Sequence, residues 1–221
     1  NNSPSVGQFY AINVDNEKPY NVYGGLQDNG VWVGANNARQ DVRWHASGQY
    51  PWESIMGGDG MQIQIDSRNS NIVYTGFQFG NYFRINREKD EQTYIQPKHE
   101  LGESPYRFNW QTPILLSPHN QDILYLGGNK LMRSMNQGDD WTPISPDLTA
   151  GGKKGNVPFG TLTNVTESPF QFGASSNWKP IAVTVPRLPL HFPPHVHEIR
   201  RCRVIDTCRS KIGDFESITT T

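Results

Sequence analysis

Cysteine is nearly absent from this sequence of 221 residues: only Cys202 and Cys208 occur, both near the end. Two cysteines cannot form the disulfide framework of a small secreted domain, and they leave the redox compartment open. An excess of charge is also lacking, because 20 basic residues stand against 21 acidic ones and neither sign forms a long run. The sequence therefore gives no electrostatic indication of a nucleic-acid partner.

Long hydrophobic runs are missing as well. No stretch approaches the roughly 18–20 consecutive apolar residues of a membrane span, so no span is predicted. Glycine (21 residues) and proline (16) are frequent, and aromatic residues make up 11% of the chain. Such a composition favours many short strands joined by tight turns over a helical bundle.

A repeat of 51 residues organises most of the chain. Four positions carry it, with a serine and a leucine substituted in the third copy: Asp15, Val22, Tyr23 and Gly25; Asp66, Val73, Tyr74 and Gly76; Ser117, Leu124, Tyr125 and Gly127. A fourth copy begins with Val165 and Ser168 and then stops, since the tyrosine expected at 176 is Ser176. The units therefore run over about 9–59, 60–110 and 111–161, with the fourth begun at 162.

Each unit has four segments with a β-type pattern, separated by turn-forming residues. The predicted strands are 9–15, 20–26, 30–34 and 42–47; 61–66, 71–77, 82–86 and 92–96; 113–117, 122–127, 130–135 and 141–145. Four short antiparallel strands in a period of about 40–50 residues are typical of a propeller blade. The predicted fold is all-β: a partial β-propeller of about three four-stranded antiparallel blades plus the first strand of a fourth. Because Tyr23, Tyr74 and Tyr125 repeat with the blades, we expect them in the core.

Residues 134–141 resemble an Asp-box, the S-x-D-x-G-x-x-W turn of bacterial neuraminidase repeats, through Ser134, Asn136, Gly138 and Trp141. The side chain of Asn136 is expected to bond amides of its own loop, and Gly138 to supply a positive φ. Trp141 is expected to bury its indole between neighbouring sheets. Asn136 replaces the usual aspartate but keeps an acceptor oxygen.

Longer strings extend this resemblance, which covers about residues 9–173: Tyr23–Gly30, Gly57–Gly60, Arg107–Pro113 and Ile144–Thr149. They are similar to bacterial sortilin-like and xyloglucanase-like repeat proteins described as glycosyl hydrolases with Asp-box repeats. The resemblance implies a secreted or periplasmic protein with further blades missing from this chain. No cofactor is expected.

Residues 174–221 read differently from the repeats. Prolines crowd 186–194 and basic residues cluster after them. We expect a non-repeat tail that is disordered or derived from a frameshift near codon 174. The spacing of His195, His197, Cys202 and Cys208 fits no standard zinc site, so no metal is predicted.

In a blade with strands A to D, the D–A and B–C loops share one face, where propeller ligands usually bind. That face is expected to hold residues 27–29, 52–59, 77–81, 106–110 and 128–129. Aromatic and amide side chains suit stacking on sugar rings and bonding to hydroxyls. The ligand-binding candidates are Gln27, Asn29, Trp52, Tyr106, Arg107, Asn109 and Trp110.

Asp28 and Asp59 are the candidate catalytic residues, since they are expected on this face at adjacent blades. Two carboxylates about 6.5–9.5 Å apart can act as acid and base in inverting glycoside hydrolysis. Asp28-Asn29-Gly30 is equally a plain turn between strands, and Gly58-Asp59-Gly60 is equally a tight entry into the innermost strand. Arg107 with Asn109 can bind a carboxylate, or Arg107 can be solvated or cap a carbonyl.

Two functions follow from these residues. The first is a secreted module that binds a protein, peptide or glycan on its loop face, and the second is a xyloglucanase-like glycoside hydrolase. An incomplete propeller leaves apolar sheet faces uncovered, so we expect this chain alone to associate or to be poorly soluble.

Overall fold

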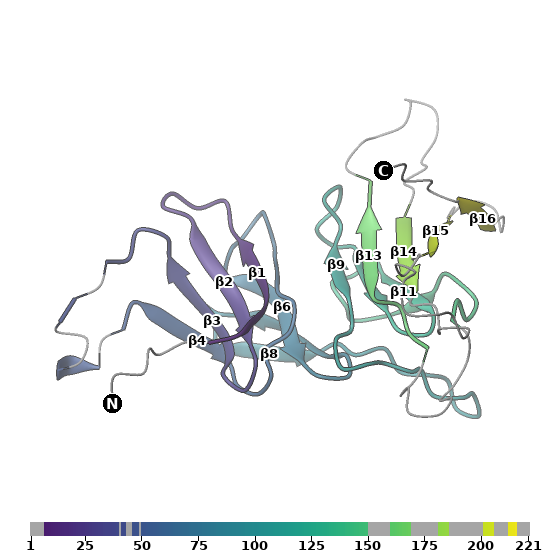
Figure 1. Ribbon diagram of the computed structural model, residues 1–221, viewed down its shortest axis with the longest axis horizontal. Coiled ribbons are helices and arrows are strands. Elements are labelled where there is room, and N and C mark those ends of the chain that lie inside the picture. The colour runs from purple at the N-terminus through teal and green to yellow at the C-terminus, as the bar shows by residue number, and fades with distance from the viewer. Residues whose placement is uncertain are drawn as a thin grey trace, which may run out of the picture. The chain divides into compact units, whose positions relative to one another are not determined.

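The chain forms four antiparallel sheets of four strands each, which confirms the predicted all-β, partial-propeller class (Figure 1). The computed structural model describes residues 7–39, 41–42, 46–48, 50–149, 160–168, 181–185, 201–205 and 212–215. Two compact units, Asn1–Gln96 and Pro97–Thr221, contain two sheets each. Among the described residues, no helix has the length and apolar character needed to cross a membrane.

The first unit contains sheets 1 and 2. Sheet 1 consists of β1 (Phe9–Val14), β2 (Asn21–Leu26), β3 (Gly30–Ala35) and β4 (Trp52–Met56). Sheet 2 consists of β5 (Gln64–Ile65), β6 (Ile72–Phe77), β7 (Asn81–Asn86) and β8 (Glu91–Tyr94). The strand registers match after a shift of 51, because Asn21 lies opposite Ala35 and Ile72 opposite Asn86.

The second unit contains sheets 3 and 4. Sheet 3 consists of β9 (Ile114–Leu116), β10 (Leu124–Gly127), β11 (Leu131–Ser134) and β12 (Thr142–Pro143). Sheet 4 consists of β13 (Asn164–Glu167), β14 (Ile181–Val185), β15 (Arg201–Ile205) and β16 (Ile212–Phe215). Its first strand was predicted, whereas three further strands lie in the expected tail. The other tail residues are outside the described ranges, and the reading frame of the tail stays a prediction.

One predicted strand is wrong. The fourth strand of sheet 1 was expected at 42–47, but the structure places it at Trp52–Met56, and Val42 is 85% exposed. The Trp52 ring lies over Gly34, where an added Cβ would come within 2.6 Å of the ring. The glycine therefore provides the flat surface that the indole covers, and Ile55 and Met56 pack against the core of the unit.

In sheets 1 to 3 the turn between the second and third strands lies at one end of the strands, together with the connection into the first strand. We call this the B–C edge, and the opposite edge, with the turn between the first and second strands, the A–B edge. At the A–B edge the repeat has a direct physical basis. An amide donates to a side chain two residues before it in three copies: Glu17 to Asp15 (3.2 Å), Arg68 to Asp66 (2.8 Å) and His119 to Ser117 (3.2 Å).

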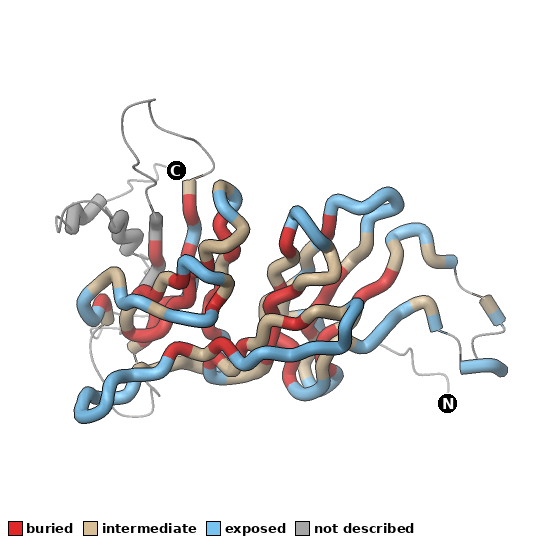
Figure 2. Tube along the Cα trace, turned by 180° about the vertical axis from the view of Figure 1, so that it is seen from behind, coloured by how far each residue is buried: buried red, intermediate tan, exposed pale blue. Residues whose placement is uncertain are grey.

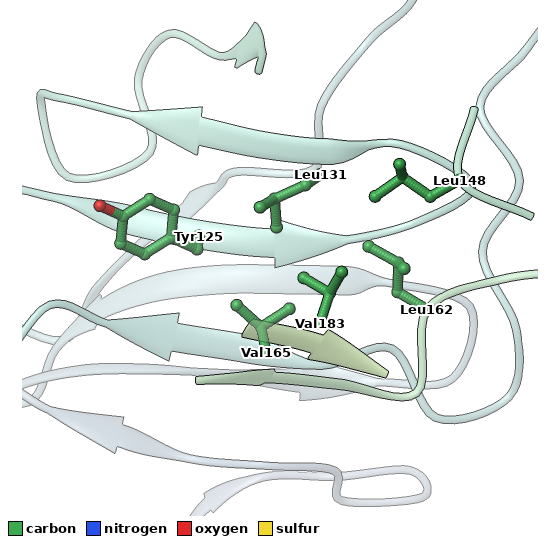
Figure 3. Close-up of a cluster of buried hydrophobic side chains, with 6 residues drawn as sticks. All are labelled: Tyr125, Leu131, Leu148, Leu162, Val165 and Val183. Atoms are coloured by element: carbon green, nitrogen blue, oxygen red, sulfur yellow. The ribbon is translucent and has the colours of Figure 1, made fainter. Parts of the chain in front are cut away.

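Each unit has an apolar core between its two sheets. In the first unit, Tyr23, Val31 and Val33 of sheet 1 belong to one buried cluster with Ile63, Val73 and Ile85 of sheet 2. In the second unit, residues of sheets 3 and 4 and their connections point toward one another: Tyr125, Leu131, Leu148, Leu162, Val165 and Val183 (Figure 3). Buried and exposed stretches alternate along the chain (Figure 2), and β2, β6 and β10 contain no exposed residue. Tyr23, Tyr74 and Tyr125 are 0–4% exposed, which confirms them as core residues.

The other face of sheet 1 is apolar but uncovered among the described residues. Phe9, Ile12 and Val14 of β1 are 47%, 61% and 50% exposed. Ile63, which is 51 residues after Ile12, is 2% exposed because it packs against sheet 1. The sequence therefore has the same kind of side chain at both positions, although only one of them is buried here.

Candidate functional site

Asp28 and Asp59 lie together at the B–C edge of the first unit. The carboxylate of Asp59 contacts the backbone amide of Asp28. Asp59 is 7% exposed and accepts the amide of Asp28 (2.7 Å) and the side-chain amide of Gln78 (2.7 Å). It thereby joins the B–C turn of sheet 1 to that of sheet 2. The Asp28 side chain is exposed, and its φ is 59°. Asp59 thus has a bridging role.

Gln27 and Asn29 flank Asp28 in the same turn. The Asn29 side chain donates to the Gln27 carbonyl (2.9 Å), and the Trp32 indole donates to the Asn29 carbonyl (2.5 Å). These bonds fix the turn from both sides. Gln27, Asp28 and Asn29 therefore lie together in one hydrogen-bonded turn at this edge.

Trp52 does not belong to this group. It begins β4 opposite Gly34, near the end of β3, and so lies at the A–B edge. The expectation that it shares a face with Asp28 and Asp59 is wrong, and the correction follows from the displaced fourth strand of sheet 1. Its 39% exposed ring covers Gly34 on the sheet surface.

At the B–C edge of sheet 3, Arg107 lies beside Asn129. The Arg107 amide donates to the Asn129 side chain (2.9 Å), and the Asn129 amide donates to the Arg107 carbonyl (3.0 Å). The guanidinium pairs with Asp147 (2.6 Å) and donates to Thr149 (2.9 Å). Arg107 is therefore paired with a carboxylate of the chain itself, and its role in binding a ligand stays a prediction.

The environment of Asp147 favours its charged form. Burial alone would raise its pKa, but hydrogen bonds from Thr149, Arg107 and Asn129 outweigh it and lower the pKa to about 2. This network locks the connection 145–149 onto the B–C turn of sheet 3. No local sequence pattern signals it, since Arg107 and Asp147 are 40 residues apart.

Three further candidates lie near Arg107. Asn109 accepts the amide of Trp110 through its side chain (2.8 Å), so its oxygen has a local backbone role. Trp110 is 42% exposed. The Lys130 ammonium lies 5.6 Å from the centre of the Tyr106 ring, a cation–π contact. The structure therefore brings aromatic, cationic and amide groups together at this edge.

The turn at residues 134–141 has the internal bonds that its sequence predicts. Asn136 Oδ1 accepts the amide of Asp140 (2.9 Å), and Ser134 Oγ accepts the amide of Gly138 (2.8 Å). Gly138 has a φ of 93°, as expected. Trp141 is half-buried. The four residues hold a tight turn, and they do so at the A–B edge, away from the ligand candidates of sheet 3.

Among the described residues, no group of three His, Cys, Asp or Glu side chains is arranged to hold a metal ion. His195, His197 and Cys208 lie outside the described ranges, and only the backbone of Cys202 is described. The second sheet contributes Gln78, Phe79 and Asn81, which lie within the range 77–81 expected on this face but were not named as ligand-binding candidates. It also contributes Tyr94 and Gln96, which the sequence did not indicate. The signal for Phe79 was its place 51 residues after Asp28.

Solved structures similar to this chain include an ancestral GH74 enzyme, which matches at a TM-score of 0.60 and 13% identity. The fold is that of a partial β-propeller. The match covers 94% of this chain and 25% of the enzyme. The GH74 enzyme of Niastella koreensis matches at a TM-score of 0.47 and 14% identity, over 94% of this chain and 37% of that one.

At this identity the likeness establishes the fold alone. GH74 enzymes are propeller glycoside hydrolases, and this chain spans a quarter of the length of the first of them. No protein-family model matches the sequence, and no curated protein matches it either. Membership of the Asp-box family, with its sortilin-like and xyloglucanase-like members, stays a prediction.

Proposed function

We propose that this chain is part of a secreted or periplasmic propeller that binds a glycan at the B–C edge of its sheets. The observation that carries the proposal is the division of roles at this edge of the first unit. The buried carboxylate of Asp59 joins two turns, whereas the exposed groups on those turns are the Phe79 ring, the Asn29 amide and the Asp28 carboxylate. Such groups stack on sugar rings and bond to their hydroxyls.

Glycoside hydrolysis is the second candidate, and the fold shared with GH74 enzymes favours it. It would need Asp28 and a second carboxylate across a bound sugar. Asp59 fits this role poorly because two donors already hold it, and a general acid needs a proton on one of those oxygens. A protein or peptide ligand has no specific observation in its favour beyond the same exposed edge.

The test measures binding and turnover on one preparation of the 221-residue chain. Calorimetry and affinity electrophoresis follow binding to soluble xyloglucan, mixed-linkage β-glucan and galactomannan, and release of reducing ends follows hydrolysis. Binding without release supports the proposal. Release that disappears in Asp28→Asn supports the hydrolase instead. Neither binding nor release for all three polysaccharides would overturn both.

A further inference from the structure

The B–C turn of sheet 2 exposes an aromatic ring at a position of unfavourable backbone geometry. Phe79 has a φ of 62°, and its side chain is 46% exposed. Asp28 occupies the equivalent place 51 residues earlier with a φ of 59°. Aspartate and asparagine tolerate the left-handed region, whereas a bulky residue there is a genuine outlier. Folding alone would favour a short polar residue at position 79.

Strained residues of this kind persist where their surroundings hold them, and they cluster at functional sites. Here two amide side chains hold the turn. Gln96 Nε2 donates to the carbonyl of Phe79 (2.8 Å), and Asn81 Nδ2 donates to the carbonyl of Gln78 (2.6 Å). Because each amide nitrogen faces a carbonyl, the orientation of both amides is fixed.

The same two amides direct their oxygens to one phenol. Tyr94 Oη lies 2.8 Å from Asn81 Oδ1 and 2.8 Å from Gln96 Oε1. Burial raises the pKa of the Tyr94 phenol, which therefore keeps its proton at neutral pH. A phenol has one proton, so it serves one of the two amide oxygens at a time. The other oxygen has the capacity to accept a hydrogen bond from a bound molecule.

We propose that Phe79, Asn81, Tyr94 and Gln96 form a subsite for an uncharged sugar ring. The apolar face of the sugar stacks on the Phe79 ring, and one of its hydroxyls donates to the amide oxygen that the phenol leaves open. All four side chains are uncharged, which suits a neutral glycan. We call these four residues the Phe79 subsite, and its assignment rests on the proposed function.

The decisive variant is Phe79→Asn, because the subsite and a structural role predict opposite results. Asparagine relieves the left-handed strain, so the Tm of the 221-residue chain should stay equal or rise by a few degrees. Loss of the ring should weaken binding to xyloglucan about tenfold. Tyr94→Phe keeps the Phe79 ring and leaves both amide oxygens open, so it should change binding by less than about threefold.

Tyr20→Ser is the matched control, since Tyr20 is an aromatic residue 44% exposed at the A–B edge of sheet 1. It should leave binding to xyloglucan unchanged. If the unmodified chain binds xyloglucan and Phe79→Asn binds it equally well, the Phe79 subsite is wrong while the proposed function stands. If Phe79→Asn loses binding together with Tm, the residue is structural and the subsite is also wrong. If the unmodified chain binds none of the three polysaccharides, both proposals fail.

Discussion

Both edges of these sheets carry turns, but the side chains in those turns are alike from sheet to sheet at the A–B edge only. At the A–B edge, a short acceptor side chain receives the amide two residues on in three successive sheets, from Asp15, Asp66 and Ser117. At the B–C edge, the first two sheets share a left-handed backbone but differ in side chain, Asp28 in one and Phe79 in the other. The repeat thus keeps the chemistry of one edge constant for folding and leaves the other edge free to vary. Residues that bind a ligand are expected at the variable edge.

The largest expected loss of stability is at the A–B edge, where the side-chain chemistry repeats. Asp15 is buried and accepts bonds from the amides of Glu17 and Asn21, the Asn21 side chain and the Tyr23 hydroxyl. Asp15→Ala leaves these donors without their acceptor and should lower the free energy of unfolding of the first unit by about 3 kcal/mol. Hydrogen exchange of the amides of β2 measures the loss. Asp15→Ser introduces the residue type of Ser117 and should recover part of it, and equal losses for the two variants would contradict the shared turn.

A smaller loss of stability is expected at Asp59, which joins the B–C turns of sheets 1 and 2. Asp59→Ala removes the acceptor of the Asp28 amide and of the Gln78 side chain, at a cost of about 2 kcal/mol. Asp28→Asn keeps the backbone conformation and should change stability by less than about 0.5 kcal/mol. Urea unfolding of the two variants separates them. If Asp28→Asn is the more destabilising, Asp59 is not the residue that joins the turns.

Exchanging the variable residue tests the backbone comparison directly. Asp28→Phe places in sheet 1 the side chain that sheet 2 has at the equivalent position. Because the turn of sheet 1 has the same left-handed φ, the substitution should cost about 1 kcal/mol. The measurement is again urea unfolding, with Asp28→Asn as the control. A neutral result would show that a phenylalanine is unstrained in this turn.

The smallest expected effect is a loss of stability at low pH, where Asp147 becomes protonated. The pKa of Asp147 is lowered from 3.8 to about 2, so its contribution to stability is complete above about pH 4 and is lost as the pH falls toward 2. Its side chain is 35% exposed, and solvent screening reduces the contribution to about 1 kcal/mol. Hydrogen exchange of the Thr149 amide, which donates to Asp147, follows this change. Asp147→Asn should remove the dependence, and an unchanged profile would assign it to another group.

The sequence predicted the second and third strands of sheets 1 to 3 closely, because those strands are buried and their pattern repeats with Tyr23, Tyr74 and Tyr125. The outermost strands were predicted less well. All four residues of β8 are exposed, and β4 begins with three exposed residues, so neither strand shows an alternating apolar pattern. The displaced β4 then misplaced Trp52. Pairs such as Arg107 and Asp147 depend on the path of the chain, which the local pattern does not contain.

The uncovered face of β1 has a consequence for how such a chain reaches its fold. Ile12 and Ile63 stand at equivalent places, and the second is buried by the preceding sheet. In this chain Tyr23, Val31 and Val33 of sheet 1 cover Ile63. The same face of a sheet in another molecule can cover Ile12 on β1 in the same way. Refolding at high concentration therefore sets two pairings in competition, one within the chain and one between chains displaced by a whole repeat. Dilution, or synthesis that delivers the sheets in order, favours the first.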